Sequence, residues 1–320
     1  MLSVVIPTYR KAGQLRRTLG ALSEQQLPEA FEWEVVVVDD GSDDAGATAR
    51  VLENLSGRLP LVAAGSGRNE GRARARNRGW RAARGRWVLF LDDDIVLRSG
   101  ALTSHVEAQR AREGVHLGTV VTAPDIVDST LFEYLDTRGV AKCAPGVEVP
   151  ARYLLTQNVS IPRAALERVD GFDEDFGAYG FEDMEIAFRL EEIAGTRFYS
   201  LPEAVGEHVH HHSLDEYLDK KVVCGRETLP RLAELHPHRL AEMRLDVLPG
   251  LGVRPSGRRR AVAAVLALSW SAGLPPMARA LVRRWPGGLA GSLRHRAYDY
   301  LVLSAYAAGL RSRMSARFGR

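Results

Sequence analysis

Three aspartates without a spacer close an apolar run near the end of the first hundred residues. Asp92, Asp93 and Asp94 directly follow Trp87–Leu91 in the stretch GRWVLFLDDDIV. Adjacent carboxylates repel one another, which raises their pKa values and costs stability unless a cation is shared between them. Mg²⁺ and Mn²⁺ take carboxylate oxygens and bridge them to phosphate groups. Because side chains alternate along an extended segment, we expect Asp92 and Asp94 at the ligand and Asp93 on the opposite side.

A second acidic group lies in the stretch GFDEDFGAYGFEDMEIAFRL, which begins at Gly171. Gly177 and Gly180 loosen the backbone before Glu182 and Asp183, which open a predicted helix. The helix dipole alone favours an acidic pair at such a position. The functional alternative is a general base held at the helix entrance.

Four histidines crowd residues 207–212, which read EHVHHH. An imidazole suits Mn²⁺ as one ligand among oxygens. A zinc site is less well supported, because no Cys or Glu lies at a familiar zinc spacing. His208 is the first candidate for a contact with the cation.

The elements that position these residues follow from the hydrophobic pattern. Continuous apolar runs alternate with helical patterns, which is typical of a parallel sheet covered on both faces. We therefore expect a mostly parallel, doubly wound α/β fold with flanking helices. Ligands bind beyond the carboxyl ends of such strands, so Pro7–Tyr9, Asp39–Asp40 and Asp92–Asp94 should share one rim. Strands are predicted at 2–7, 34–38, 61–64, 87–91, 115–123 and 156–162, and helices around 15–22, 45–55, 70–83, 101–112, 182–193 and 213–235.

The helix predicted over 70–83 is rich in arginine. Most of these side chains are expected to be solvated, with one or two facing a diphosphate. The preceding GSGRNEG has its third glycine one residue late for the dinucleotide fingerprint, and no glycine loop follows the first strand. This pattern excludes a Rossmann dehydrogenase.

Charge is distributed unevenly along the 320 residues, whose net charge is +3. From Arg254 onward there are 13 arginines, no lysine and one acidic residue, Asp299, so this end carries +12 and the remainder −9. Such asymmetry indicates an anionic partner. Because the arginines interleave with aliphatic side chains, an anionic membrane surface is favoured over nucleic acid for residues 254–320. Packing of these helices on the catalytic domain or on a partner subunit is the structural alternative.

The Gly/Pro-rich stretch Gly250–Gly257 sets the predicted domain boundary. It separates a catalytic domain, 1–250, from a basic amphipathic helical extension, 251–320. Cys143 and Cys224 make neither a disulfide framework nor a metal motif, and no signal peptide is recognisable. We therefore expect a cytoplasmic protein, peripheral at the inner face of the cell membrane.

Five segments, VVIPTYR, VVVVDDGSDD, NEGRARARNRG, FLDDD and GFDEDFGAYGFEDMEIAFRL, occur in this order. As an ordered set they resemble family 2 glycosyltransferases of the GT-A fold over residues 2–212. The resemblance implies an inverting enzyme that uses Mn²⁺ or Mg²⁺ to move a sugar from a UDP-, GDP- or dTDP-sugar to an acceptor hydroxyl, as in polysaccharide biosynthesis. It also implies a nucleotide-sugar-binding half, 1–95, and an acceptor-binding half, 96–250.

The same resemblance implies roles for single residues. Asp183 corresponds to the catalytic base, with Glu182 beside it. Tyr179, Gly180 and Glu182 correspond to acceptor contacts. The implied metal ligands are Asp92, Asp94 and His208, and the implied contacts with the nucleotide sugar are Pro7, Thr8, Tyr9, Asp39, Asp40, Arg76, Asn77, Asp92 and Asp93.

Two other functions stay open at this stage. A sugar-phosphate nucleotidyltransferase shares the sheet and the metal, but it normally carries a glycine-rich basic loop after the first strand, where this chain has Pro7–Arg10. A catalytically inactive sugar-nucleotide-binding or scaffold protein would be indicated by loss of Asp94 or Asp183, and both are present.

Overall fold

The computed structural model describes residues 1–124, 129–140, 142–209, 213–284 and 291–318. The chain forms two compact units: unit 1 comprises Met1–Val127, Leu135–Gly177 and Glu182–His211, and unit 2 comprises Asp128–Tyr134, Ala178–Phe181 and His212–Arg320. The predicted boundary at 250/251 is therefore wrong. The helix predicted over 213–235 packs with the C-terminal helices, and two short segments from earlier in the chain join that unit.

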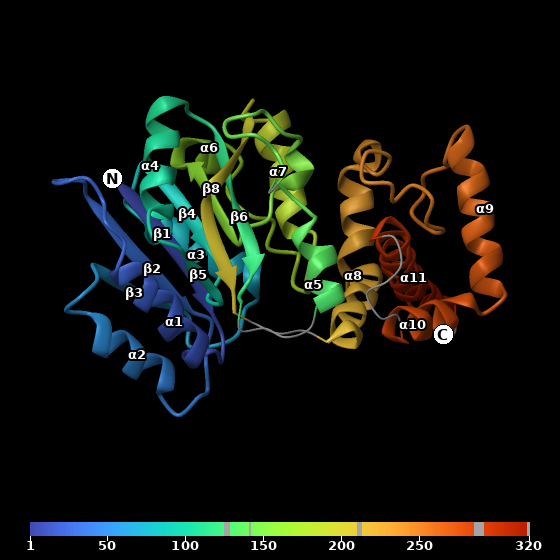
Figure 1. Ribbon diagram of the computed structural model, residues 1–320, viewed down its shortest axis with the longest axis horizontal. Helices are drawn as coiled ribbons and strands as arrows, with labels where there is room; N and C mark the ends of the chain where they lie inside the picture. Colours follow the sequence, from blue (N-terminus) through green and yellow to red (C-terminus); the bar gives the residue numbers. More distant parts are fainter. Residues whose placement is uncertain (125–128, 141, 210–212, 285–290, 319–320) are drawn as a thin grey trace. The chain divides into compact units, whose positions relative to one another are not determined.

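Unit 1 is built on one eight-stranded sheet in the order β3-β2-β1-β4-β7-β6-β8-β5 (Figure 1). The strands β1 to β4 are mutually parallel, as predicted. Strand β7 pairs antiparallel with both β4 and β6, so the second half of the sheet is mixed. The strands are β1 (Leu2–Thr8), β2 (Trp33–Asp39), β3 (Leu61–Gly65), β4 (Trp87–Leu91), β5 (Ile95–Leu97), β6 (Val115–Thr122), β7 (Asn158–Pro162) and β8 (Phe198–His208).

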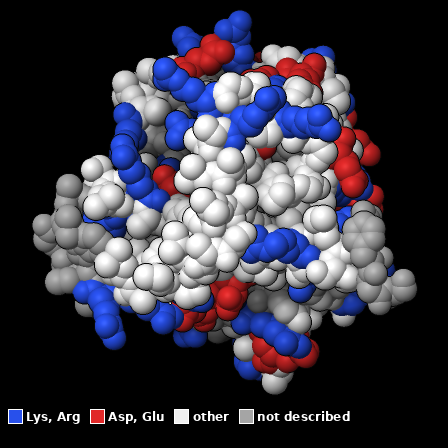
Figure 2. All heavy atoms as spheres, turned by 90° about the vertical axis from the view of Figure 1, so that its right-hand side faces the viewer, with Lys and Arg blue, Asp and Glu red and all other residues white. Residues whose placement is uncertain are grey.

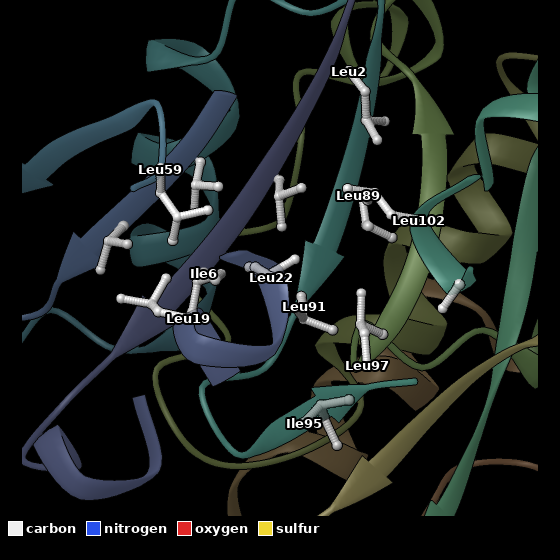
Figure 3. Close-up of a cluster of buried hydrophobic side chains, with 14 of the residues drawn as sticks. Leu2, Ile6, Leu19, Leu22, Leu59, Leu89, Leu91, Ile95, Leu97 and Leu102 are labelled. Atoms are coloured by element: carbon white, nitrogen blue, oxygen red, sulfur yellow. The ribbon is translucent and has the colours of Figure 1, made fainter. Parts of the chain in front are cut away.

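Helices cover both faces of this sheet. On one face, α1 (Ala12–Ser23), α2 (Ala47–Leu55) and α4 (Ala101–Ala111) close the main hydrophobic core. Figure 3 shows Ile6 of β1 among Leu19 and Leu22 of α1 in this core. On the other face, α3 (Arg72–Ala82) approaches β1 so closely that a Cβ on Gly79 would lie 2.3 Å from Val5 Cγ1. The alternation of Val5 and Ile6 along one strand thus produces two covered faces.

Shorter helices complete unit 1. Helix α6 (Arg163–Arg168) follows β7, and α7 (Glu182–Glu192) carries the second acidic motif at its first turn. Helix α5 (Ser129–Asp136) contributes most of its length to unit 2. A single turn of 3₁₀ helix spans Ala151–Tyr153 in unit 1, and another spans Pro237–Arg239 in unit 2.

Unit 2 is helical, as predicted for the C-terminal end of the chain. It contains α8 (Leu214–Leu235), α9 (Arg258–Ser271), α10 (Leu274–Arg284) and α11 (Gly291–Phe318). Glycines allow the backbones of α8 and α11 to approach closely. A Cβ on Gly225 would lie 2.3 Å from the Tyr306 carbonyl oxygen, and a Cβ on Gly309 would lie 2.2 Å from the Val222 carbonyl oxygen. The first turn of α8 is fixed by a capping box between Ser213 and Glu216.

Candidate active site

The carboxyl ends of β1, β2 and β4 lie at one rim of the sheet, as parallel pairing requires. Strand β4 ends at Leu91, one residue before Asp92. The three aspartates then form a turn, in which the Ile95 N–H donates to the Asp92 carbonyl at 3.1 Å. The segment is not extended, so the alternation predicted for the three side chains is wrong.

Asp93 and Asp94 are joined by a lysine. Lys11 Nζ lies 3.2 Å from Asp93 Oδ1 and 2.7 Å from Asp94 Oδ2. The Thr8 hydroxyl donates to Asp93 Oδ2 at 2.7 Å. Burial raises the pKa of Asp93 to about 6, against the charge of Lys11. At Asp94 burial acts in the same direction, but His208 and Lys11 outweigh it and hold the pKa well below its usual range.

The register of the sheet brings His208 to Asp94. Strand β5 pairs antiparallel with β8, which places Ile95 opposite His208. His208 Nε2 consequently lies 3.6 Å from Asp94 Oδ1, and the Val209 N–H donates to the Asp94 carbonyl at 2.9 Å. The other three histidines of EHVHHH, at 210–212, lie outside the described residues.

Arg76 links the two acidic motifs. Its Nη2 lies 3.1 Å from Asp92 Oδ1, and its Nη1 lies 2.9 Å from Glu182 Oε1 and 3.5 Å from Asp183 Oδ1. Its side chain is only 1% exposed. A single buried guanidinium therefore holds the turn after β4 against the first turn of α7, since three carboxylates share its charge.

Asp183 is the more accessible member of the Glu182–Asp183 pair. Its side chain is 18% exposed, against 3% for Glu182. The Thr156 hydroxyl donates to Asp183 Oδ1 at 2.6 Å and fixes its orientation. Burial, aided by the negative charge of Glu182, raises the pKa of Asp183 to about 6, although Arg76 and Thr156 act against the rise. A carboxylate with a pKa in this range is suited to accept a proton near neutral pH.

The predicted nucleobase contacts are engaged in local hydrogen bonds. Asp40 accepts the backbone N–H groups of Glu70 and Gly71 at 2.9 and 3.0 Å, which holds the loop before α3 to the end of β2. Asp39 accepts the Ser42 N–H at 2.9 Å. Both residues lie at the predicted rim, and their contact with a base stays a prediction.

Asn77, a predicted contact with the sugar donor, is engaged in hydrogen bonds within the protein. It is 1% exposed, its side chain accepts the Phe172 N–H at 2.8 Å, and its amide donates to the Phe172 carbonyl and to Glu174. Arg76 and Asn77 are both buried. Contact of Arg76 or Asn77 with the sugar donor stays a prediction, and the observed partners of Arg76 at the site are carboxylates.

The predicted acceptor contacts are distributed over both units. Glu182 lies in unit 1 and is committed to Arg76. Tyr179 and Gly180 lie in unit 2, where the Cys224 thiol donates to the Tyr179 carbonyl at 3.0 Å and a Cβ on Gly180 would lie 2.5 Å from Cys224 Sγ. The Tyr179 ring meets Lys221, whose Nζ lies 5.9 Å from the ring centre. Contact of these residues with an acceptor stays a prediction.

The donor atoms at the rim fit a hard divalent cation. Asp94 offers carboxylate oxygens on a side chain that already contacts an imidazole, and Asp92 and Asp93 follow in the same turn. Lys11 occupies the space between two of these carboxylates as a positive charge. Oxygen ligands with one imidazole suit Mn²⁺, and carboxylates with phosphate oxygens suit Mg²⁺.

Two site residues escaped the sequence prediction. Lys11 lies two residues after the predicted strand-end segment Pro7–Tyr9, at the rim that we had assigned to ligand binding. Its place in the sequence could therefore have identified it as a site residue. Thr156 opens the stretch TQNVSIP, which we assigned to a strand, but β7 begins only at Asn158 and leaves Thr156 free to reach Asp183.

Comparisons with known proteins find glycosyltransferases. Residues 3–135 match the model of the family described as glycosyl transferase family 2. An uncharacterized glycosyltransferase, YfnE, of Bacillus subtilis is 26% identical over 260 residues, covering 66% of this chain and 65% of that protein. Validoxylamine A glucosyltransferase of Streptomyces hygroscopicus is 34% identical over 223 residues, covering 59% of this chain and 51% of that protein. The chain thus spans only about half to two thirds of the length of these curated relatives.

Solved structures establish the fold. The mannosyltransferase PcManGT of Pyrobaculum calidifontis, in complex with GDP-Man and Mn²⁺, superposes with a TM-score of 0.62 at 22% identity, over 96% of this chain and 86% of that chain. TarS 1–349 of S. aureus, in complex with UDP-GlcNAc, gives a TM-score of 0.53 at 20% identity, over 100% and 92% of the two chains. At these identities the likeness shows the fold alone, and the fold is the predicted one.

Proposed function

The chain carries a family 2 glycosyltransferase domain of the GT-A fold, and on that premise we propose that it transfers a sugar from a nucleotide-diphosphate sugar to an acceptor hydroxyl with inversion at the anomeric carbon. The observation that carries the proposal is the convergence of Asp183, Arg76 and Asp92 at the carboxyl end of the sheet. The Arg76 guanidinium contacts both the Asp183 carboxylate and Asp92 of the aspartate turn.

Asp183 is the proposed general base. Its carboxylate accepts the proton of the acceptor hydroxyl as that oxygen attacks the anomeric carbon. Thr156 keeps Oδ1 oriented, and Arg76 keeps Asp183 at a fixed distance from the aspartate turn. A single displacement inverts the configuration, so the reaction needs no nucleophilic carboxylate on the enzyme.

Asp92, Asp94 and His208 are the proposed ligands of Mn²⁺ or Mg²⁺, with Asp93 close by. When bound, the cation supplies Lewis-acid neutralisation of the departing diphosphate. The nucleoside is proposed to lie along Pro7–Tyr9 and Asp39–Asp40, beside this cation. GDP-Man and UDP-GlcNAc in the structural neighbours support a nucleotide-diphosphate sugar as donor.

The cellular location of the protein is also a proposal. Both cysteines are free thiols, Cys224 buried and Cys143 partly buried, which supports a cytoplasmic setting. An anionic membrane surface is the proposed partner of the C-terminal helices. Glycan, lipid-linked and small-molecule acceptors all remain compatible with a hydroxyl nucleophile.

A panel of UDP-, GDP- and dTDP-sugars tests the proposed reaction. We expect sugar release with Mn²⁺ or Mg²⁺, loss of activity in EDTA and recovery on adding the cation. Asp94→Ala should lose turnover and metal dependence together, while Asp170→Ala should not, because the Asp170 side chain is 89% exposed and pairs with Arg81. NMR of the product should report the inverted anomer. Full activity in EDTA would remove the metal from the proposal, and donor binding without sugar release would identify an inactive binding protein.

A further inference from the structure

Beyond its three N-terminal arginines, helix α9 is apolar around its middle turns and is nevertheless mostly exposed. Its sequence is RRRAVAAVLALSWS, and Leu266 is its only buried residue. Val265 is 67% and Leu268 72% exposed. A helix that is hydrophobic all round is normally covered by a protein core or by lipid. Within unit 2, Ser269 and Trp270 at the end of α9 bond to Tyr300 and Ser304 of α11, but the side chains of Val262, Val265 and Leu268 stay exposed.

Helix α10 extends the exposed apolar surface. Leu274, Met277 and Leu281 are all exposed and recur at i, i+3 and i+7, which is one stripe of the helix. The opposite side anchors α10 within unit 2, since Val282 is buried and both Arg279 and Arg283 pair with Asp215. The stripe is therefore held outward by contacts on the other side of the same helix.

The charge along this segment is of one sign. Between Asp246 and Asp299 the chain has no acidic residue and nine arginines. Arg259 is paired with Asp246, whereas Arg258 and Arg260 are exposed at the start of α9 and Arg284 at the end of α10. Figure 2, which faces the end of the molecule where Figure 1 draws α9, shows a broad uncharged area interrupted by basic side chains.

We propose that α9 and α10 form a docking surface for an anionic membrane, on which they lie flat. An anionic bilayer offers both partners that the surface needs: an apolar layer for Val265 and Leu268, and lipid phosphates for Arg258 and Arg260. A second copy of the chain fits less well, because a two-fold interface would bring the same arginines against each other. This inference goes beyond the proposed reaction and does not depend on it.

The length of the helices favours lying on the membrane over crossing it. Helix α9 has 14 residues, whereas a span needs ~20. In the described residues no single helix is long and apolar enough to cross a bilayer. Helices α9 and α10 together have the length and composition of a span, but the pair is bent by 87°. Two short apolar helices joined by such a bend present their sides to an interface.

Vesicle flotation of the full chain tests the docking surface. We expect flotation with vesicles of phosphatidylcholine and phosphatidylglycerol, weaker flotation at high salt, and little with phosphatidylcholine alone. Val265→Glu with Leu268→Glu should lower the partition coefficient at least ~10-fold, because two inserted apolar side chains become charged. Arg258→Gln with Arg260→Gln should lower it ~5-fold for each arginine removed.

A control variant on unit 1 and a measurement of oligomeric state complete the experiment. Leu155 and Ile193 are exposed apolar residues of unit 1, 45% and 55% exposed, and their double change to Glu should leave flotation unaltered. Light scattering of the same samples should show one oligomeric state for all variants. Failure of the wild-type chain to float, equal flotation of Val265→Glu/Leu268→Glu, or conversion of an oligomer to a monomer by that pair would each overturn the proposal.

Discussion

Asp183→Asn should make the protein more stable and much less active. Burial raises the pKa of Asp183 to about 6, so the folded state holds an ionised carboxylate at a cost when the pH is neutral. A rise of about two pKa units over an unperturbed Asp corresponds to up to ~3 kcal/mol, and we expect a gain of ~1–3 kcal/mol in unfolding free energy for the amide. Asn keeps the oxygen that accepts from Thr156 and Arg76. The proton-transfer role is lost, which typically costs ~10²–10⁴ in rate.

The pH dependence separates this cause from a general packing effect. Since the folded pKa is raised, the ionised group destabilises the fold above about pH 6, and the penalty disappears as pH falls toward the unfolded value near ~4. The stability advantage of Asp183→Asn, measured by urea or thermal unfolding, should therefore be full at neutral pH and absent in acid. Wild-type kcat/KM should fall below about pH 6, and the exposed control Asp170→Asn should change neither quantity. A less stable Asp183→Asn variant, or one with wild-type turnover, would refute the reasoning.

Two further predictions concern Lys11 and the packing of α3. Lys11→Met should lower the melting temperature in EDTA and enlarge the stabilisation by Mn²⁺, because Asp93 and Asp94 lose their shared cation; an unchanged Mn²⁺ response in thermal shift and calorimetry would contradict this. Gly79→Ala should destabilise by ~1–3 kcal/mol, because its Cβ would overlap Val5. A Cβ on Gly20 would have no atom within 4 Å, so Gly20→Ala should instead stabilise the fold by up to ~1 kcal/mol. If urea unfolding showed that both substitutions stabilise, or that both destabilise, close packing at Gly79 would not be the cause.

Buried parallel strands were the most predictable part of the fold. Because both faces of β1, β2 and β4 are covered, their sequences are continuous apolar runs whose ends can be read within one or two residues. The acidic and polar residues after them mark the rim for the same reason. The position of β7 between β4 and β6 was not predictable in this way, since it depends on pairing between segments far apart in the chain.

Arg76 shows where the site reasoning from sequence was incomplete. In RARARNRG every second residue is arginine, and we expected most of them to be solvated. Ala73, Gly79 and Trp80 of α3 are buried, and Arg76 lies three or four residues from each, on the same face of the helix. Helical spacing therefore marked Arg76 as the arginine that points inward. What it contacts depends on Asp92 and Glu182, which only the folded chain brings together.

The balance of charge at the rim explains why donor and cation binding should depend on each other. In the described part of the chain, five carboxylates at the rim contact two permanent cations, Arg76 and Lys11, and one histidine, His208; they belong to Asp92, Asp93, Asp94, Glu182 and Asp183. Fully ionised, this cluster is negative, and the diphosphate of a nucleotide sugar would add further negative charge. A divalent cation offsets part of this negative charge and binds carboxylate and phosphate oxygens at the same time. By linkage, each ligand then raises the affinity for the other by the same factor. We therefore expect weak binding of a nucleoside diphosphate at the rim without a cation, and calorimetry with UDP or GDP in EDTA and in Mn²⁺ checks this.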